Sequence, residues 1–321
     1  MISATFEPPA PFEYVPQLLA QSLSPRAMND RADVVGLLNG GPVLVPRGTG
    51  APISLLPPRA SGALPTGINS AGLVTVSARF GDGAHLVVYG SGVFMEIAAP
   101  GLDVFPHAIS NANEIVGVYR PVNAPVTAER AFLYDGAKLK DLGTIHRWSA
   151  AYAVNGSGAA VGTTDGLDGL ETGAYFHDGI VEDLSTSEVH VVDGQAISDS
   201  GWIVGTGSVE GIIRLPAGTV KTVGLLPGGK ASALSTVNND GIAAGTAVVF
   251  GHRSPLARSS PGNEVPRAVV YRGDHLWDLA RLARLPSSAL LVSAVAVNRG
   301  GQVLAYGTID GVQGAWLFTP R

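Results

Sequence analysis

The amino-acid sequence predicts an all-β fold made of seven repeated four-stranded units, and three observations support this prediction. The 321 residues include 42 Gly and 22 Pro, which break helices and favour short strands joined by turns. Hydrophobic residues make up 45% of the chain, which argues against disorder, and no G-X-Y period points to collagen. One sequence pattern recurs seven times along the chain.

The recurring pattern is a small residue, an aliphatic residue and Asn or Ser, followed by a turn and an aliphatic strand. Its polar residues stand 40 to 45 residues apart, except for a last interval of 60 residues. They are Asn29, Asn69, Ser110, Asn155, Ser198, Asn238 and Asn298. Three residues further on stand Ala32, Gly72, Asn113, Gly158, Gly201, Gly241 and Gly301. This position suits the left-handed residue of a hairpin turn, where Gly or Asn fits and Ala32 is the exception. The second strand closes at Gly36, Val76, Gly117, Gly162, Gly205, Gly245 and Ala305.

Each unit continues with an apolar third strand, a Gly-rich turn and a fourth strand that ends in a polar–aliphatic pair. In the third unit these parts are Ala131–Tyr134, Asp135-Gly136 and Asp141-Leu142. Four short antiparallel strands at this period are typical of one blade of a β-propeller. We therefore predict that residues 1–321 form a single seven-bladed β-propeller domain.

The two ends of the sequence predict how the ring closes. The seventh unit lacks a fourth strand after Phe318, whereas Tyr14–Leu18 provides a spare strand at the start. We expect the N-terminal strand to complete the last blade, because this pairing removes an exposed sheet edge. An open solenoid is the alternative, and it would need polar caps at both ends.

The repeat resembles the HAF-type repeat family, whose units read roughly A-I-N-x-x-G-x-I-V-G before an aromatic-ended strand and a D-L strand. The match is best in Ala108–Gly117 with Ala131–Leu142, and in Ala153–Gly162 with Ala174–Leu184. Members of that family are usually described as extracellular proteins without a settled activity. The resemblance therefore implies a fold more than a function.

Composition excludes several classes of protein. A net charge of −5 and the lack of a basic cluster argue against nucleic-acid binding. The absence of Cys excludes disulfides, a thiolate nucleophile and Cys-ligated metals. The longest apolar stretch, Ala289–Val297, is too short to span a membrane, and the N-terminal segment is not a secretory signal. We expect a soluble, cytoplasmic protein, or an extracellular one if a leader has been removed.

A candidate site follows from the repeat. The loops that enter the first strand and those between the second and third strands share one face, called the top; the Asn/Ser turns lie on the bottom. Propellers generally place ligands at the top mouth of the central channel. Three residues before each Asn or Ser stand Arg26, Thr66, His107, Tyr152, Gln195, Ser235 and Val295. These mostly polar positions are expected to converge on that mouth, or else merely to meet channel water.

We assign roles within this set. His107 and Tyr152 are the candidate proton-transfer pair, because imidazole and phenol groups serve as base and acid. The candidate substrate-binding residues are Arg26, Thr66, Gln195 and Ser235, with Arg79, His146, Trp148, His190, His252 and Arg253 from the top loops. The longer loop of the sixth unit, 247–267, is expected to be a lid, a partner-binding arm or a disordered segment.

Other chemistry finds little support in the sequence. It contains no phosphate-binding loop, nucleophile elbow or H-E-x-x-H motif. No cofactor is expected; local spacing does not support a divalent metal, and Asp165–Gly169 resembles a calcium loop only faintly. The bottom Asn and Gly positions are interpreted as turn chemistry.

Two hypotheses for the function follow. The first is an enzyme that performs non-redox acid–base chemistry of the lyase, cyclase or hydrolase type on a small molecule, without a cofactor or with metal assistance. The second is a non-catalytic propeller that binds a protein or glycan partner through its top face and the 247–267 loop. The sequence predicts no oligomeric state.

Overall fold

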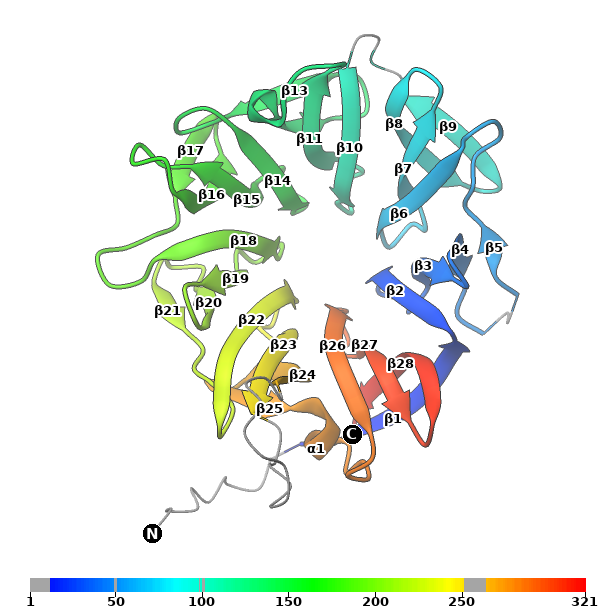
Figure 1. The fold of residues 1–321 in the computed structure, drawn as a ribbon, viewed down its shortest axis with the longest axis vertical. Helices are drawn as coiled ribbons and strands as arrows, with labels where there is room; N and C mark the ends of the chain where they lie inside the picture. The colour runs from blue at the N-terminus through cyan, green and yellow to red at the C-terminus, as the bar shows by residue number, and fades with distance from the viewer. Residues whose placement is uncertain (1–11, 49–50, 98, 100–101, 251–263) are drawn as a thin grey trace, which may run out of the picture.

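The computed structural model describes residues 12–48, 51–97, 99, 102–250 and 264–321. These residues form seven four-stranded antiparallel sheets arranged as blades around a central channel (Figure 1). The sheet order confirms the predicted all-β, seven-bladed propeller. It also excludes the open solenoid, because the last blade contains strands from both ends of the chain.

The strands are grouped here by their place in a blade. The innermost strands are β2 (Leu23–Met28), β6 (Gly62–Ile68), β10 (Leu102–Ile109), β14 (Ser149–Val154), β18 (Val191–Ile197), β22 (Gly229–Val237) and β26 (Leu290–Val297). The second strands are β3 (Val34–Leu38), β7 (Val74–Phe80), β11 (Ile115–Pro121), β15 (Ala160–Asp165), β19 (Ile203–Gly207), β23 (Ala243–Phe250) and β27 (Val303–Ile309). The third strands are β4 (Gly41–Val45), β8 (Gly83–Gly90), β12 (Arg130–Tyr134), β16 (Glu171–His177), β20 (Gly211–Arg214), β24 (Glu264–Arg272) and β28 (Val312–Pro320).

The outermost strands are β5 (Ile53–Ser54), β9 (Val93–Ile97), β13 (Leu139–Gly143), β17 (Ile180–Asp183), β21 (Val220–Thr222), β25 (His275–Asp278) and β1 (Tyr14–Gln21). Blades 1 to 7 are numbered by the order of their innermost strands, from β2 to β26. In the part of the chain that the structure describes, two short helices, η1 (Val126–Ala128) and α1 (Leu279–Leu282), lie in connecting segments. In the described ranges, no helix has the length and apolar character that a membrane crossing requires.

The N-terminal strand closes the ring as predicted. β1 pairs antiparallel with β28, from Tyr14 opposite Pro320 to Gln21 opposite Gly314. The side chain of Tyr14 is buried in the core between blades 6 and 7, and its hydroxyl donates a hydrogen bond to the carbonyl of Gly301 at 3.2 Å. This pairing supplies blade 7 with the outer strand that its own repeat lacks.

Every innermost strand contains a β-bulge at the same place. The pairing register skips one residue in each, and the skipped residues are Arg26, Thr66, His107, Tyr152, Gln195, Ser235 and Val295. These are the seven positions that the sequence singled out. A bulge residue is unpaired and its side chain is re-aimed relative to its neighbours, which explains why this position escapes the constraints of the repeat.

The bulge also explains why glycine recurs at one position of the second strand in most of the seven units. Gly36, Gly117, Gly162, Gly205 and Gly245 lie opposite the residue that precedes the bulge in their blades. A Cβ atom on Gly162 would lie only 1.9 Å from the carbonyl oxygen of Ala150 in the bulged strand. Blades 2 and 7 carry Val76 and Ala305 at this position. Glycine therefore lets the second strand lie directly against the bulged backbone in five blades.

The predicted 247–267 loop is shorter than the sequence suggested. β23 and β24 extend as a paired hairpin, with Ala247 opposite Arg267 and Phe250 opposite Glu264. Pairing satisfies the backbone N–H and C=O groups of these residues, which an open loop would leave to water. The remainder of that loop, with the candidate residues His252 and Arg253, lies outside the described residues.

Candidate functional site

The part of the channel that the bulge residues surround, two residues before each innermost strand ends, is here called the upper channel. His107 and Tyr152 contact each other there. His107 is the bulge residue of β10 and Tyr152 that of β14 in the next blade, and their ring centroids lie 5.4 Å apart. Nδ1 of His107 lies 2.8 Å from the carbonyl oxygen of Ala151. Because a carbonyl oxygen only accepts, Nδ1 carries the hydrogen and Nε2 is left with a lone pair.

The surroundings of His107 favour its neutral form. Burial lowers the pKa of His107, and the hydrogen bond to Ala151 offsets part of that effect. The lowered pKa keeps the imidazole uncharged at neutral pH, with Nε2 available as a hydrogen-bond acceptor or a proton acceptor.

Tyr152 has the opposite chemical character. Burial, together with the nearby carboxylates of Glu171, Asp193 and Glu129, raises the pKa of Tyr152 to about 12. The hydroxyl has no hydrogen-bond partner among the described residues. Tyr152 is therefore a protonated donor at neutral pH, next to a neutral acceptor on His107.

Three carboxylates from three blades make this side of the channel acidic. Asp193 of β18 accepts a hydrogen bond from the backbone N–H of Thr206 at 3.1 Å, and the side chain of Gln195 also bonds to it. Burial raises the pKa of Asp193 above its usual value. Glu171 accepts a hydrogen bond from the hydroxyl of Thr163 at 3.1 Å. Glu129 forms an ion pair with Arg120 at 3.1 Å.

Of the other bulge residues, Ser235 and Thr66 form hydrogen bonds, whereas Arg26 is exposed. Ser235 donates a hydrogen bond to the carbonyl of Ala294 in the next blade at 3.2 Å, as His107 does to its neighbour. Thr66 stays within its own blade, where its hydroxyl lies 3.0 Å from that of Thr75. Arg26 is exposed and forms no ion pair with any described residue. Among the seven bulge residues, all of which the structure describes, a ring contact joins His107 and Tyr152.

The described candidate residues of the top loops lie on different blades, except for His146 and Trp148, which share one loop. His146 and Trp148 belong to the segment that enters β14, and His190 directly precedes β18. Arg79 lies near the end of β7, on the blade 2 side of the ring, and is exposed. Nδ1 of His190 lies 3.5 Å from the hydroxyl of Ser185, and this histidine is also exposed.

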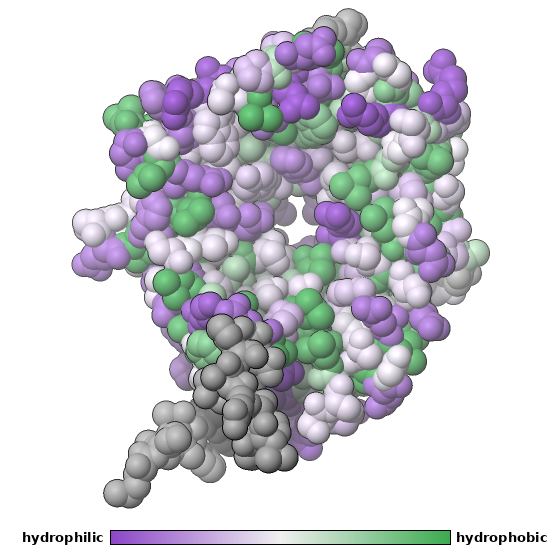
Figure 2. All heavy atoms as spheres, in the orientation of Figure 1, coloured by the Kyte–Doolittle hydropathy of each residue, from purple (hydrophilic) through white to green (hydrophobic). Residues whose placement is uncertain are grey.

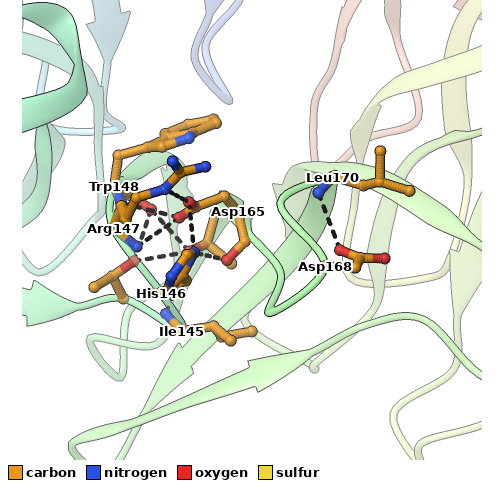
Figure 3. Close-up of polar contacts among 9 residues, drawn as sticks. Ile145, His146, Arg147, Trp148, Asp165, Asp168 and Leu170 are labelled. Carbon is orange, nitrogen blue, oxygen red and sulfur yellow. Dashed lines mark hydrogen bonds and ion pairs between the residues drawn. The ribbon is translucent and has the colours of Figure 1, made fainter.

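Asp165 organises the loop that carries His146 and Trp148 (Figure 3). One oxygen of this buried carboxylate accepts the backbone N–H groups of Arg147 at 2.7 Å and Trp148 at 3.0 Å. The other accepts Nε of Arg147 at 2.8 Å and lies 3.2 Å from Nδ1 of His146. This role was not predicted, although the carboxylate that ends the second strand β15 is visible in the sequence.

The same contacts decide the nature of the Asp165–Gly169 segment. Burial by itself raises the pKa of Asp165, but the hydrogen bonds from Trp148 and Arg147 outweigh it and hold the pKa well below its usual range. Asp168 instead accepts the backbone N–H of Leu170 at 3.0 Å. Both oxygens of Asp165 thus face N–H donors, the opposite of what a calcium ligand needs. In the described parts of the chain, no three His, Asp or Glu side chains gather as a metal site.

The Asn/Ser turns on the bottom face form a ring of contacts between blades, here called the turn ring. Oδ1 of Asn29 accepts the backbone N–H groups of Arg31 at 3.0 Å and Asp33 at 2.9 Å. Its Nδ2 donates to the carbonyl of Asn69 in the next blade at 3.1 Å, and Asn69 donates to that of Ser110 at 3.2 Å. These contacts confirm the interpretation as turn chemistry and add a fastening role that the sequence did not predict.

A cavity of about 230 Å³ lies at the bottom mouth of the channel, inside the turn ring. Figure 2 shows the opening of the channel at the centre of the ring. One aliphatic side chain from each blade, the residue before each Asn or Ser, surrounds the channel there. This channel collar consists of Met28, Ile68, Ile109, Val154, Ile197, Val237 and Val297. The sequence predicted a site at the top mouth and not this cavity, because the residues that line the cavity come from seven distant segments.

Comparison with known proteins shows the fold. No family model matches the sequence, so membership of the HAF-type repeat family is not supported, and no curated protein matches it. Virginiamycin B lyase from Staphylococcus aureus is similar with a TM-score of 0.57 and 11% identity, over 96% of this chain and 99% of that one. YCF48 from Cyanidioschyzon merolae is similar with a TM-score of 0.54 and 11% identity, over 95% and 99%.

A third likeness covers only part of the other protein. The Pyrococcus horikoshii acylaminoacyl peptidase has a TM-score of 0.55 and 11% identity, over 97% of this chain but 52% of its own. At 11% identity these likenesses carry no information on activity. They show that this chain has the β-propeller fold.

Proposed function

We propose that this protein binds a small molecule in the upper channel and acts on it by non-redox acid–base chemistry of the lyase, cyclase or hydrolase type. The observation that carries the proposal is the contact between His107 and Tyr152, whose ring centroids lie 5.4 Å apart. Two adjacent bulges turn a neutral imidazole and a protonated phenol toward the same part of the channel.

The two side chains supply complementary steps. Nε2 of His107 has the lone pair needed to accept a proton, because Nδ1 is held by the carbonyl of Ala151. The hydroxyl of Tyr152 donates a hydrogen bond or a proton to a leaving group. The carboxylates of Glu171 and Asp193 lie close enough to influence Tyr152 and favour a neutral or cationic substrate. In this scheme neither step needs a cofactor.

Arg26 and Gln195 are proposed to orient the substrate. Gln195 is the bulge residue of blade 5, next to Tyr152 of blade 4, whereas Arg26 belongs to blade 1 on the far side of the ring (Figure 1). Trp148 and His146 are proposed to line the top of the same channel, in the loop that Asp165 holds.

A substrate screen tests the proposal. Lactones, hydroxy acids, esters and amines are incubated with the protein, and turnover is followed by NMR. For any substrate found, H107Q and Y152F are expected to lower kcat about a hundredfold, the lower range for loss of a general acid or base. The matched control is K138A, an exposed side chain in the turn between β12 and β13 that is expected to leave turnover unchanged. Full turnover in both H107Q and Y152F would contradict the assigned roles.

A non-catalytic propeller is the second candidate, and one observation favours it. His107 and Ser235 both hydrogen-bond to a carbonyl of the next blade, which is a fastening role. YCF48, which shares this fold, has been solved bound to a D1 peptide. Capture of a specific peptide or glycan through the top face, without turnover of any compound in the screen, would support this candidate over the first.

A further inference from the structure

The bottom mouth of the channel has the features of a second ligand site, independent of the chemistry proposed for the upper channel. Its cavity of about 230 Å³ exceeds the volume of one water molecule, about 30 Å³, and lies below the roughly 300–1,000 Å³ of sites for drug-sized ligands. The space therefore suits a ligand of the size of one small ring.

The turn ring itself offers little to such a ligand. The amide oxygen of each Asn is occupied by backbone N–H groups of its own turn, as in Asn238 with Asp240 and Ile242, both at 3.0 Å. The amide nitrogen is occupied by the carbonyl of the next blade, as in Asn238 with Asn298 at 3.1 Å. Recognition must come from the residues around this ring.

The next residue of each turn forms an outer rim, which consists of Asp30, Ser70, Asn111, Gly156, Asp199, Asn239 and Arg299. Four rim side chains accept a backbone N–H from the rim residue of the preceding blade. Asn111 accepts from Ser70 at 2.9 Å and Asn239 from Asp199 at 2.9 Å. Asp30 accepts from Arg299 at 2.9 Å, and Asp199 from Gly156 at 2.7 Å. Each of these side chains is thereby held in one orientation before any ligand arrives.

One polar atom of most rim side chains is left for a ligand. Nδ2 of Asn111 and Nδ2 of Asn239 are donors, and Oδ2 of Asp199 is an acceptor; none of the three has a hydrogen-bond partner among the described residues. The guanidinium of Arg299 likewise forms no ion pair within the described ranges. Asp30 accepts the hydroxyl of Ser70 at 2.8 Å and retains further acceptor capacity.

The chemistry of the rim selects a class of ligand. Two carboxylates repel a hard anion, and one guanidinium with two amide donors disfavours a simple cation. A rim that offers both donors and acceptors suits hydroxyl groups, because each hydroxyl both donates and accepts. Deeper in the channel, the channel collar presents aliphatic side chains such as Val154 and Ile197 to the C–H groups of a ring.

We propose that the bottom mouth binds a neutral polyhydroxylated ring, of the chemical class of a monosaccharide or cyclitol. Blade 4 lines the cavity with Val154 alone, since Gly156 has no side chain at its rim position. A substituent on the bound ring points out of the cavity at Gly156, where the rim has no side chain.

The experiment measures binding of free glucose, galactose, mannose, xylose and myo-inositol to the full chain by saturation-transfer NMR and calorimetry. Inorganic phosphate and putrescine serve as the anionic and cationic probes. At least one neutral ring is expected to bind saturably. V154F, which places an aromatic ring in the cavity, is expected to abolish this binding. V295F is the matched control, because it places the same side chain at the bulge position in the upper channel.

A second variant keeps the proposal testable if V154F does not fold. The double variant N111D/N239D retains the Oδ1 acceptors for the backbone but replaces both free amide donors, so that neutral-ring affinity is expected to fall roughly tenfold, about 1.4 kcal/mol. The proposal is overturned if no neutral ring binds, if only phosphate or putrescine binds, or if V295F rather than V154F abolishes binding. Y152F is expected to leave this binding unchanged, which separates it from the proposed function.

Discussion

The imidazole of His107 donates a hydrogen bond to the carbonyl oxygen of Ala151, 2.8 Å away, and so joins blade 3 to blade 4 at their bulges. At the same contact the ring of Tyr152 lies next to the imidazole. The bulge therefore does two things at once: it fastens neighbouring blades and fixes the tautomer of a side chain in the channel.

This contact predicts an acid-sensitive stability. Burial lowers the pKa of His107 in the folded protein, whereas the unfolded chain takes up a proton near pH 6.5. The unfolded state binds more protons between those two values, so the contribution of His107 is present above about pH 6.5 and is lost as the pH falls through that window. In H107Q, whose amide can donate to the same carbonyl but does not titrate, the free energy of unfolding is expected to fall less between pH 7.5 and pH 5. Equal losses in both proteins, measured by urea denaturation, would contradict this.

The glycine opposite the bulge predicts a steric effect. In Gly162→Ala the new methyl group would overlap the carbonyl of Ala150, 1.9 Å away, so the second strand must move off the bulged strand. We expect a loss of about 3 kcal/mol in the free energy of unfolding, at the upper end of overpacking effects. Gly179→Ala is the control, because a Cβ there meets no atom within 4 Å and only its positive φ of 76° costs energy. Denaturant titration gives both values.

The carboxylate of Asp165 predicts a structural requirement for the loop 144–148. Asp165→Asn keeps the shape but removes the charge and turns an N–H₂ group toward N–H donors. We expect a loss of about 2–3 kcal/mol at neutral pH, as for removal of charged hydrogen bonds. Because its pKa is held well below the usual range, Asp165 contributes fully above about pH 4 and less as the pH falls further.

The control for Asp165 lies three residues away. Asp168→Asn changes an exposed carboxylate that accepts one backbone hydrogen bond, so its effect is expected to stay below about 1 kcal/mol. Similar losses for the two variants would show that Asp165 does not organise the loop. Hydrogen exchange at the N–H groups of Arg147 and Trp148 reports the loop directly.

The turn ring predicts a reciprocal pair of effects. In Asn69→Ser the hydroxyl still serves its own turn, as Ser110 does for Ala112 and Glu114, but the donor to Ser110 is lost. We expect a loss of about 1 kcal/mol. Ser110→Asn supplies the missing amide toward blade 4 and is expected to add about the same amount. Thermal and denaturant unfolding measure both, and a loss of stability in Ser110→Asn would refute the fastening role.

The repeat pattern was enough to predict the number of blades, their four strands and the closing strand at Tyr14. It was enough because each blade uses local rules that the sequence displays: hairpin turns, alternation and glycine at fixed offsets. The bulge positions were recognised as unusual, but not as bulges. A bulge is defined by which residue of the second strand, such as β3 or β15, lies opposite it. The sequence of one strand alone does not give this register.

The channel contacts were predicted only in part. Position in the repeat placed His107 and Tyr152 in neighbouring blades, and the structure shows that their rings meet. The length of the loop between β23 and β24 was overestimated, because Phe250 and Glu264 pair although neither belongs to the repeat pattern.

The sequence by itself determined the ring of seven blades and the strand that closes it, because a repeat encodes every blade with the same local pattern. Only the tertiary structure decided which polar groups have partners. Ser235, Asn69 and Asp165 each find theirs in a blade or loop 18 to 59 residues away along the chain. Whether a side chain fastens the ring or is left for a ligand depends on contacts between blades, and those form only when the ring is closed.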